Sequence, residues 1–316
     1  MKPYTYSLLA AIFACGMAQG AATAYTTPVG YYQFDGKAGG NMFVPSVVKP
    51  AAFAGSLTAA GTTTLTVAAS SLTAGAYDEG ALFATHYVEI TSGANAGVAL
   101  DIVSNTTSVI TLADDISALS LTGTETIKIR PHVTLKSSLV DAEASLAGYN
   151  DTATFYTVDG NAVTYIYGAD GATGWSSDFA TADGDLRPVA PGTGFVLGLS
   201  ADGPLTVTGE VKSSDTVVML GAGAINIVGP VNPLVGTSTS LNSTGFADVG
   251  AYTDSISIYV PGPLVDAVTY YALGDGTVSS DFVTPTTDTI SNTTGAVVIP
   301  LGSIALRIYS GFTVAP

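Results

Sequence analysis

The residues that could do nucleophilic or acid–base chemistry are few in this chain, and they lie far apart. The two histidines, His86 and His132, have no Gly-x-Ser-x-Gly turn to work with, because the sequence contains none. The one cysteine, Cys15, lies within the first 24 residues, so removal of that segment would leave no thiolate and no Cys/His zinc site. The sequence therefore predicts a protein that is not an enzyme.

A pair of carboxylates for glycoside hydrolysis is the enzyme hypothesis that stays open, because a sequence does not show how far apart two acids lie. The available glutamates are Glu79, Glu89, Glu125, Glu143 and Glu210. A sugar cleft also needs exposed aromatic side chains, and the chain has a single tryptophan, Trp175.

Three aspartates, Asp178, Asp183 and Asp185, form the best candidate cation site. They fall within eight residues, and Asp183-Gly184-Asp185 resembles part of an oxygen-rich Ca²⁺ loop. No EF-hand spacing is present, and Asp-Gly pairs are more often turns than ligands. Ca²⁺ is the only cofactor that the sequence suggests.

Four Asn-x-Ser/Thr sequons fall in segments expected to be loops, where a glycan could be attached in a secreted protein. They are Asn105, Asn150, Asn242 and Asn292. In a chain so rich in threonine and serine, chance accounts for such matches readily.

The N-terminal segment of the expected mature protein is the best candidate for an interaction site. Residues 25–34 are extended and uncharged, and residues 36–40 follow as a glycine-rich hinge. Alternation places Val29 and Tyr31 on one face and Tyr32 and Phe34 on the other. Such a strand either pairs within its own domain or completes the sheet of a neighbouring subunit by strand donation. The candidate donor residues are Tyr25, Pro28, Val29, Tyr31, Tyr32 and Phe34.

The elements that must position these residues are predicted to be almost entirely strands. Short β-branched segments with alternating apolar residues recur, such as residues 62–67, 83–90 and 125–133. Asp-Gly turn signals recur as well, at residues 35–36, 159–160, 170–171, 183–184, 202–203 and 275–276. This pattern predicts an all-β fold of antiparallel sandwiches or barrel-like domains. One short helix is expected near residues 137–147.

The second half of the chain contains an internal duplication. Ser176-Ser177-Asp178-Phe179 and Ser279-Ser280-Asp281-Phe282 each follow a tyrosine-containing strand and an Asp-Gly turn, about a hundred residues apart. The repeats are expected at about 151–200 and 254–308.

The chain begins with a secretory signal peptide pattern. Lys2 precedes an apolar run that is too short to span a membrane, and Ala22-Thr23-Ala24 matches a cleavage site. The expected organisation is a signal peptide at 1–24, the N-terminal strand and hinge at 25–40, and a β domain at 41–136. A helical linker at 137–150 and a duplicated β region at 151–316 complete it.

Composition excludes several partners. The net charge is −16, and it becomes −17 once Lys2 is removed with the signal peptide. Such acidity argues against nucleic acid and against anionic lipid surfaces. Only 11% of the residues are charged while the mean hydropathy is +0.42, which favours a surface largely covered by other subunits. No later segment has the length of a membrane-spanning helix.

Five segments of the chain carry a resemblance to known sequences: residues 26–31, 48–55, 87–97, 191–195 and 229–234. They resemble a family of secreted β-rich proteins of unknown function that occurs as multiple paralogues in verrucomicrobial and related environmental bacteria. The resemblance covers essentially the whole mature chain. It implies secretion and a β-rich fold, and it carries over no catalytic residue.

The leading functional prediction is a secreted structural protein whose subunits form an extracellular filament, a homopolymer linked by the N-terminal strand. The alternative is a monomeric module that binds glycans or surfaces through Tyr165, Tyr167, Trp175, Tyr270 and Tyr271. A third interpretation, an outer-membrane barrel, requires strands of about 9–11 residues with aromatic girdles, and the strands here look shorter.

Overall fold

The computed structural model describes residues 29–157, 160–169, 171, 174–212, 214–229, 238–259, 262, 267–291, 295–300 and 304–308. Nearly all regular structure in these residues is antiparallel strand, and the helical segments are no longer than six residues, so the predicted all-β class is confirmed. No helix in the described part of the chain has the length and hydropathy needed to cross a membrane. The predicted signal peptide and the residues Tyr25 and Pro28 lie outside the described residues.

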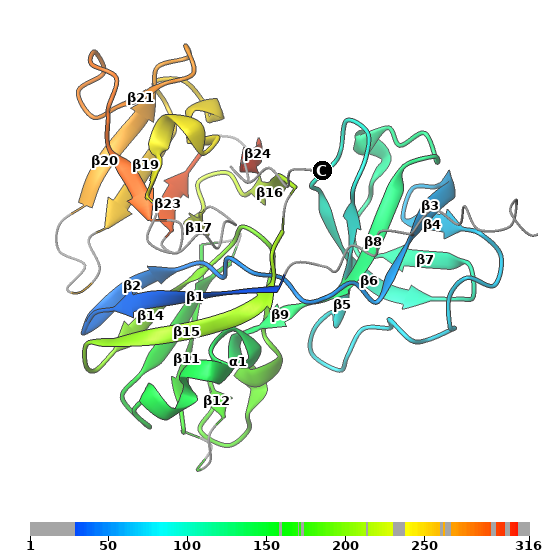
Figure 1. Ribbon diagram of the computed structural model, residues 1–316, viewed down its shortest axis with the longest axis horizontal. Helices are drawn as coiled ribbons and strands as arrows, with labels where there is room; N and C mark the ends of the chain where they lie inside the picture. Colours follow the sequence, from blue (N-terminus) through cyan, green and yellow to red (C-terminus); the bar gives the residue numbers. More distant parts are fainter. Residues whose placement is uncertain are drawn as a thin grey trace, which may run out of the picture.

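One module is a closed six-stranded barrel, seen on the right of Figure 1. Its strands alternate between buried aliphatic and more exposed side chains, as their β-branched sequences predict. They are β3 (Phe53–Ala60), β4 (Thr64–Val67), β5 (His86–Ile90), β6 (Ala99–Asn105), β7 (Val109–Leu112) and β8 (Thr126–Pro131).

A sandwich-like unit, called copy A here, is built from the segments on both sides of the barrel. Its five-stranded sheet has the order β12-β11-β10-β14-β2, with separate pairs β1-β15 and β9-β13. The strands are β1 (Val29–Gly36), β2 (Gly39–Phe43), β9 (Val133–Thr134), β10 (Thr152–Tyr156), β11 (Ala162–Tyr167), β12 (Trp175–Ser176), β13 (Pro188–Val189), β14 (Phe195–Leu199) and β15 (Gly203–Glu210). The short helical segments are α1 (Leu135–Ser138), η2 (Val140–Ser145) and η3 (Asp183–Leu186).

A second unit, copy B, repeats this arrangement. Its five-stranded sheet has the order β21-β20-β19-β23-β17, with pairs β16-β24 and β18-β22. The strands are β16 (Thr216–Leu220), β17 (Asn226–Val228), β18 (Ser238–Ser240), β19 (Ser255–Tyr259), β20 (Ala267–Ala272), β21 (Val278–Ser279), β22 (Thr289–Ser291), β23 (Ala296–Ile299) and β24 (Ile304–Ile308). The 3₁₀ segments η4 (Leu241–Ser243) and η5 (Phe246–Asp248) complete it.

The two copies match strand for strand, so the duplication is larger than the sequence predicts. Asn41 of β2 and Asn226 of β17 show this well: each side-chain amide donates to three carbonyl oxygens and accepts one backbone N–H at the turn before its strand. β1 and β2 therefore belong to copy A, with β16 and β17 as their counterparts. The barrel is an insertion between β2 and β9.

The copies pack against each other through reciprocal contacts. The Gly194 N–H donates to the Ile227 carbonyl (2.9 Å), and the equivalent Gly295 N–H donates to the Met42 carbonyl (3.0 Å). Such an exchange is what an approximate two-fold relation produces. An apolar cluster fills the interface with equivalent residues of both copies; its members are Met42, Val44, Ile227 and Val297, with Tyr156, Val196, Ile225 and Tyr259 beside them.

These pairings differ from the expected domain limits. The region predicted as a domain at 41–136 contains the barrel, but β2 pairs with β14 across its whole length. The predicted helix at 137–147 is instead α1 followed by η2. Thr134 caps α1 by accepting the Ser137 N–H, so the helix starts two residues earlier than expected.

A buried ionic cluster fixes the barrel to copy A. Arg130 of β8 bonds Glu89 of β5 and Glu210 of β15, each at 2.8 Å, and Lys212 lies 3.2 Å from Glu89. Burial alone would raise the pKa of Glu89, but the charges of Lys212 and Arg130 outweigh it and hold that pKa below its usual value.

Candidate functional site

The three aspartates of the candidate Ca²⁺ site each have local hydrogen-bond partners. Asp178 accepts the N–H groups of Ala180 and Thr181 at 2.9 and 2.8 Å. Asp183 accepts the N–H and hydroxyl of Ser177, while Asp185 accepts the Trp175 N–H and pairs with Lys136. In the described part of the chain no group of three metal-binding side chains converges, so Ca²⁺ binding stays a prediction without an assembled oxygen cage.

The sequons differ in accessibility. Asn105 is buried, and its side chain is held by Tyr77, Thr73 and Thr106, which makes it unsuited to carry a glycan. The Asn242 amide bonds Thr286 and Val278. Asn150 is exposed, and Asn292 lies outside the described residues.

Residues that could have formed a hydrolytic site are separated or enclosed. His86 contacts the Thr85 hydroxyl, whereas buried His132 lies 3.0 Å from Asp101. Glu89 and Glu210 do come together, but both are buried against Arg130. Buried carboxylates that are paired with Arg130 and Lys212 are closed to a substrate.

The aromatic residues named for surface binding are mostly core. Tyr165, Tyr167, Trp175 and Tyr270 are at most 5% exposed. Other aromatic residues are exposed, and two from each copy adopt positive φ, which is rare for bulky side chains. These four residues are Tyr149 and Phe179 of copy A and Tyr252 and Phe282 of copy B.

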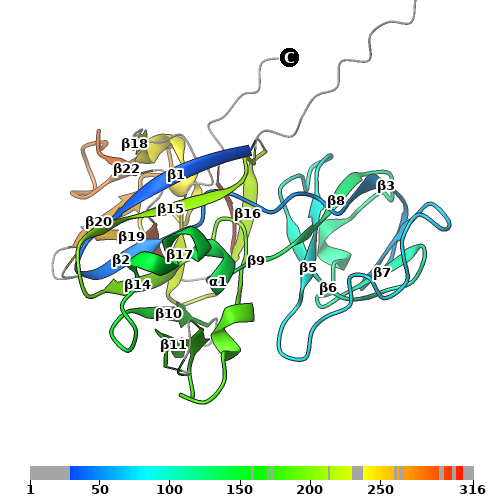
Figure 2. The ribbon, with the colours of Figure 1, turned by 60° about the horizontal axis from the view of Figure 1, so that its bottom comes forward.

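β1 shows the predicted alternation of buried and exposed side chains, and one of its two edges has no strand partner among the described residues. Its Tyr32 and Phe34 are buried in the core of copy A, while Val29 and Tyr31 are 76% and 68% exposed, as predicted. β1 pairs with β15 over eight consecutive residues without a bulge, and Figure 2 shows the two strands side by side. Within the described ranges, β15 is its only strand partner.

The outer edge of β1 is open, whereas the far edge of β15 is covered. Glu210 directs both its N–H and its carbonyl to Val48, on the side away from β1. Val29, the β1 residue opposite Glu210, therefore exchanges no backbone hydrogen bonds with it. Because hydrogen-bonded and non-hydrogen-bonded pairs alternate along an antiparallel ladder, the backbone N–H and carbonyl groups of Tyr31 and Gln33 also point away from β15. Thr208 of β15 also donates to Asp141 of η2.

The counterpart strand in copy B lacks this open edge. Val217 of β16 occupies the position of Gln33, and its N–H donates to the Gly97 carbonyl of the barrel at 3.0 Å. Arg307 of β24 adds bonds to the Ala94 and Ala96 carbonyls. The barrel thus covers one of two equivalent edges, while no strand in the described part of the chain pairs with the other.

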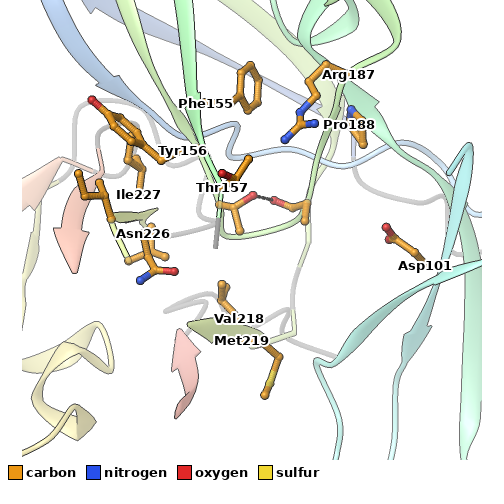
Figure 3. Close-up of a pocket in the computed structure, with 15 residues that line it drawn as sticks. Asp101, Phe155, Tyr156, Thr157, Arg187, Pro188, Val218, Met219, Asn226 and Ile227 are labelled. Atoms are coloured by element: carbon orange, nitrogen blue, oxygen red, sulfur yellow. Dashed lines mark hydrogen bonds between the residues drawn. The ribbon is translucent and has the colours of Figure 1, made fainter. Parts of the chain in front are cut away.

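A cavity of about 410 Å³ lies where copy A, copy B and the barrel meet. Figure 3 shows Arg187 and Phe155 of copy A, Val218 and Asn226 of copy B, and Asp101 of the barrel around it. No sequence pattern predicts this cavity, because its lining comes from three modules far apart in the chain.

The fold and these surfaces define an all-β protein made of a duplicated sandwich-like unit with an inserted barrel. Comparison with known protein families, with curated proteins and with solved structures found no match to this chain.

Proposed function

We propose that the protein is a secreted, non-enzymatic structural protein whose chains assemble with copies of themselves through β1. The open edge of β1 is the observation that supports this function. Natural proteins protect long edge strands with lysine, proline, bulges or a covering segment. β1 has no lysine, proline or bulge, and its only charged residue, Asp35, pairs with Lys37 just past the end of the strand.

Edge pairing suits this geometry better than strand donation. Donation would pull Tyr32 and Phe34 out of the core and would open the β1–β2 turn, where the Lys37 N–H donates to Asn41 and the Ala38 N–H to Asp202. In edge pairing β1 stays in place and pairs antiparallel with β1 of another chain. Two identical strands are then self-complementary about a two-fold axis, and the exposed Tyr31 side chains become cross-strand neighbours.

The decisive variant is Gln33→Pro. It removes an outward N–H that β15 does not use, and proline is tolerated at such edge positions. We expect wild-type protein to associate with rising concentration in sedimentation velocity and Gln33→Pro to remain monomeric. Gln33→Thr, which keeps the N–H, is the matched control and should behave as wild type. Equal association of all three proteins would contradict edge pairing.

A disulfide between Gln33→Cys and Thr206→Cys separates the two assembly modes. These positions face each other as a non-hydrogen-bonded pair of β1 and β15, so the bond locks β1 into its own chain. Edge pairing should survive the lock, whereas strand donation, and the filament that it propagates, would be lost. Electron microscopy of the locked and reduced forms gives the size of the assemblies directly.

A second candidate function is a monomeric surface-binding module, and the exposed aromatic residues at positive φ favour it. Backbone strain retained in both copies at Tyr149, Phe179, Tyr252 and Phe282 is typical of functional loops. Wild-type protein that stays monomeric at every concentration would support this candidate and would overturn self-assembly.

A further inference from the structure

We propose that the cavity between the three modules binds a small molecule that carries one carboxylate, with Arg187 as the partner of the carboxylate. This site is independent of the β1 edge.

Arg187 directly precedes β13, where two backbone hydrogen bonds and contacts with two aromatic rings hold it in place. Its N–H donates to the Gly184 carbonyl at 3.0 Å, and its own carbonyl accepts the Leu135 N–H at 2.8 Å. The guanidinium carbon lies 5.3 Å from the centre of the Phe83 ring and 5.2 Å from that of Phe155. The rings contact the guanidinium without accepting its in-plane N–H groups, which can therefore donate hydrogen bonds to other groups.

Those N–H groups have no protein acceptor in the described part of the chain. The Nε atom is buried without a hydrogen bond. The other two arginines both face carboxylates, Arg130 at 2.8 Å and Arg307 at 3.8 Å, but Arg187 has no ion pair among the described residues. Figure 3 shows its guanidinium pointing toward the cavity, so a bound anion could satisfy it.

The charges around the cavity favour a ligand that carries a single carboxylate. The fork of a guanidinium matches a planar carboxylate with two parallel hydrogen bonds. A polyanion would meet the negative field of a chain with net charge −16 and the Asp101 carboxylate on the barrel side of the cavity. One arginine balances one negative charge.

The rest of the lining is mixed: polar groups such as Thr157 and Thr193 lie beside apolar side chains that can contact the body of the ligand. Phe155, Val218, Ile225 and Ile227 contribute aromatic and aliphatic surface, and the Asn226 amide is already committed to its own turn. The volume is within the range of small-molecule sites. In copy B the position of Arg187 is Asp288, whose carboxylate accepts the Tyr270 hydroxyl, so the site belongs to copy A alone.

The test compares phenylacetate with its neutral isostere phenylacetamide, by ligand-observed NMR and calorimetry on the full mature chain. We expect phenylacetate to bind at millimolar concentration at least ~10-fold more tightly than phenylacetamide, because a hydrogen-bonded charge is worth about 1.5–3 kcal/mol. Arg187→Met should abolish this preference, and Arg187→Lys should weaken it.

Lys128→Met is the control for loss of one positive charge, since Lys128 lies on barrel strand β8 away from the cavity, and it should bind as wild type. Circular dichroism verifies that each variant is folded. Absence of phenylacetate binding, equal affinity for the two probes, or unchanged preference in folded Arg187→Met would each overturn the proposal.

Discussion

At the scale of single residues, the carboxylates of this chain mainly organise loops. Asp178 and Asp281 accept equivalent N–H groups in the two copies, and these bonds hold the pKa of both carboxyls well below the usual range. Asp178, which the sequence offers as a metal ligand, therefore also serves as a turn acceptor. Residue type and spacing alone do not distinguish the two roles, because the competing donors are backbone N–H groups, which every residue except proline has.

Glu125 allows this role to be measured. Its carboxylate accepts the N–H groups of Thr122, Gly123 and Thr124 at 2.8, 2.9 and 3.1 Å. The Thr122 bond is the main reason that its pKa is lowered to about 2. We expect Glu125→Gln to lower the free energy of unfolding by about 1–2 kcal/mol at neutral pH.

The pH dependence follows from the sign of this shift. The folded pKa lies below the unfolded value of 4.5, so the advantage of wild type is complete above about pH 4.5 and disappears as the pH falls through about 2. Thermal unfolding, followed by circular dichroism between pH 2 and 7, measures the difference in stability between wild type and Glu125→Gln. Glu79→Gln, at an exposed glutamate, is the control. A difference that is independent of pH would contradict the role given to Glu125.

At the scale of elements, the important contact is the one between the barrel and β16. Gly97 has φ +99°, and a Cβ there would lie 2.7 Å from the Asp215 carbonyl oxygen. Gly97→Ala should therefore displace the barrel from β16 and speed hydrogen exchange at the Val217 N–H by at least ~10-fold, since a clash adds to the cost of about 1 kcal/mol for positive φ.

Gly75→Ala is the matched control for this variant. Gly75 is a barrel residue at φ +72°, and a Cβ there would lie at an ordinary 3.5 Å from Asp78. It should lower barrel stability slightly while leaving exchange at Val217 unchanged. Equal exchange at Val217 in the two variants would show that the Gly97 contact does not hold β16.

Alternation and turn residues were sufficient to predict the strands and one part of the duplication. The alternating exposure of Val29, Tyr31, Tyr32 and Phe34 is confirmed. The wider duplication was missed because the barrel insertion changes the spacing between copies, from 185 residues at Asn41 and Asn226 to 103 at Asp178 and Asp281. A search at one fixed spacing finds only the part after the insertion.

At the scale of the whole molecule, cohesion depends on the ionic cluster at Arg130. Replacing this buried arginine with methionine leaves Glu210 enclosed without its cation and Glu89 with Lys212 as its one remaining cation among the described residues. Breaking a buried pair costs about 3–5 kcal/mol. We expect Arg130→Met to separate the unfolding of the barrel from that of the two copies, so that calorimetry records two transitions where wild type gives one.

Lys37→Met removes a half-exposed cation that pairs with Asp35 and Asp202, and it serves as the control. It should leave the free energy of unfolding nearly unchanged, because exposed ion pairs contribute little to stability. A single transition in Arg130→Met, at the temperature of wild type, would mean that other contacts hold the barrel in place.

If chains pair through β1 as proposed, the inserted barrel would also limit how many chains can join. A duplicated unit without it would present two equivalent edges, on β1 and on β16, and would behave as a bifunctional monomer that links end to end without limit. The Gly97–Val217 bond blocks one of these edges. In the terms of polymer chemistry, the barrel would act as a built-in chain stopper: each molecule would be monofunctional, and edge pairing would end at two chains.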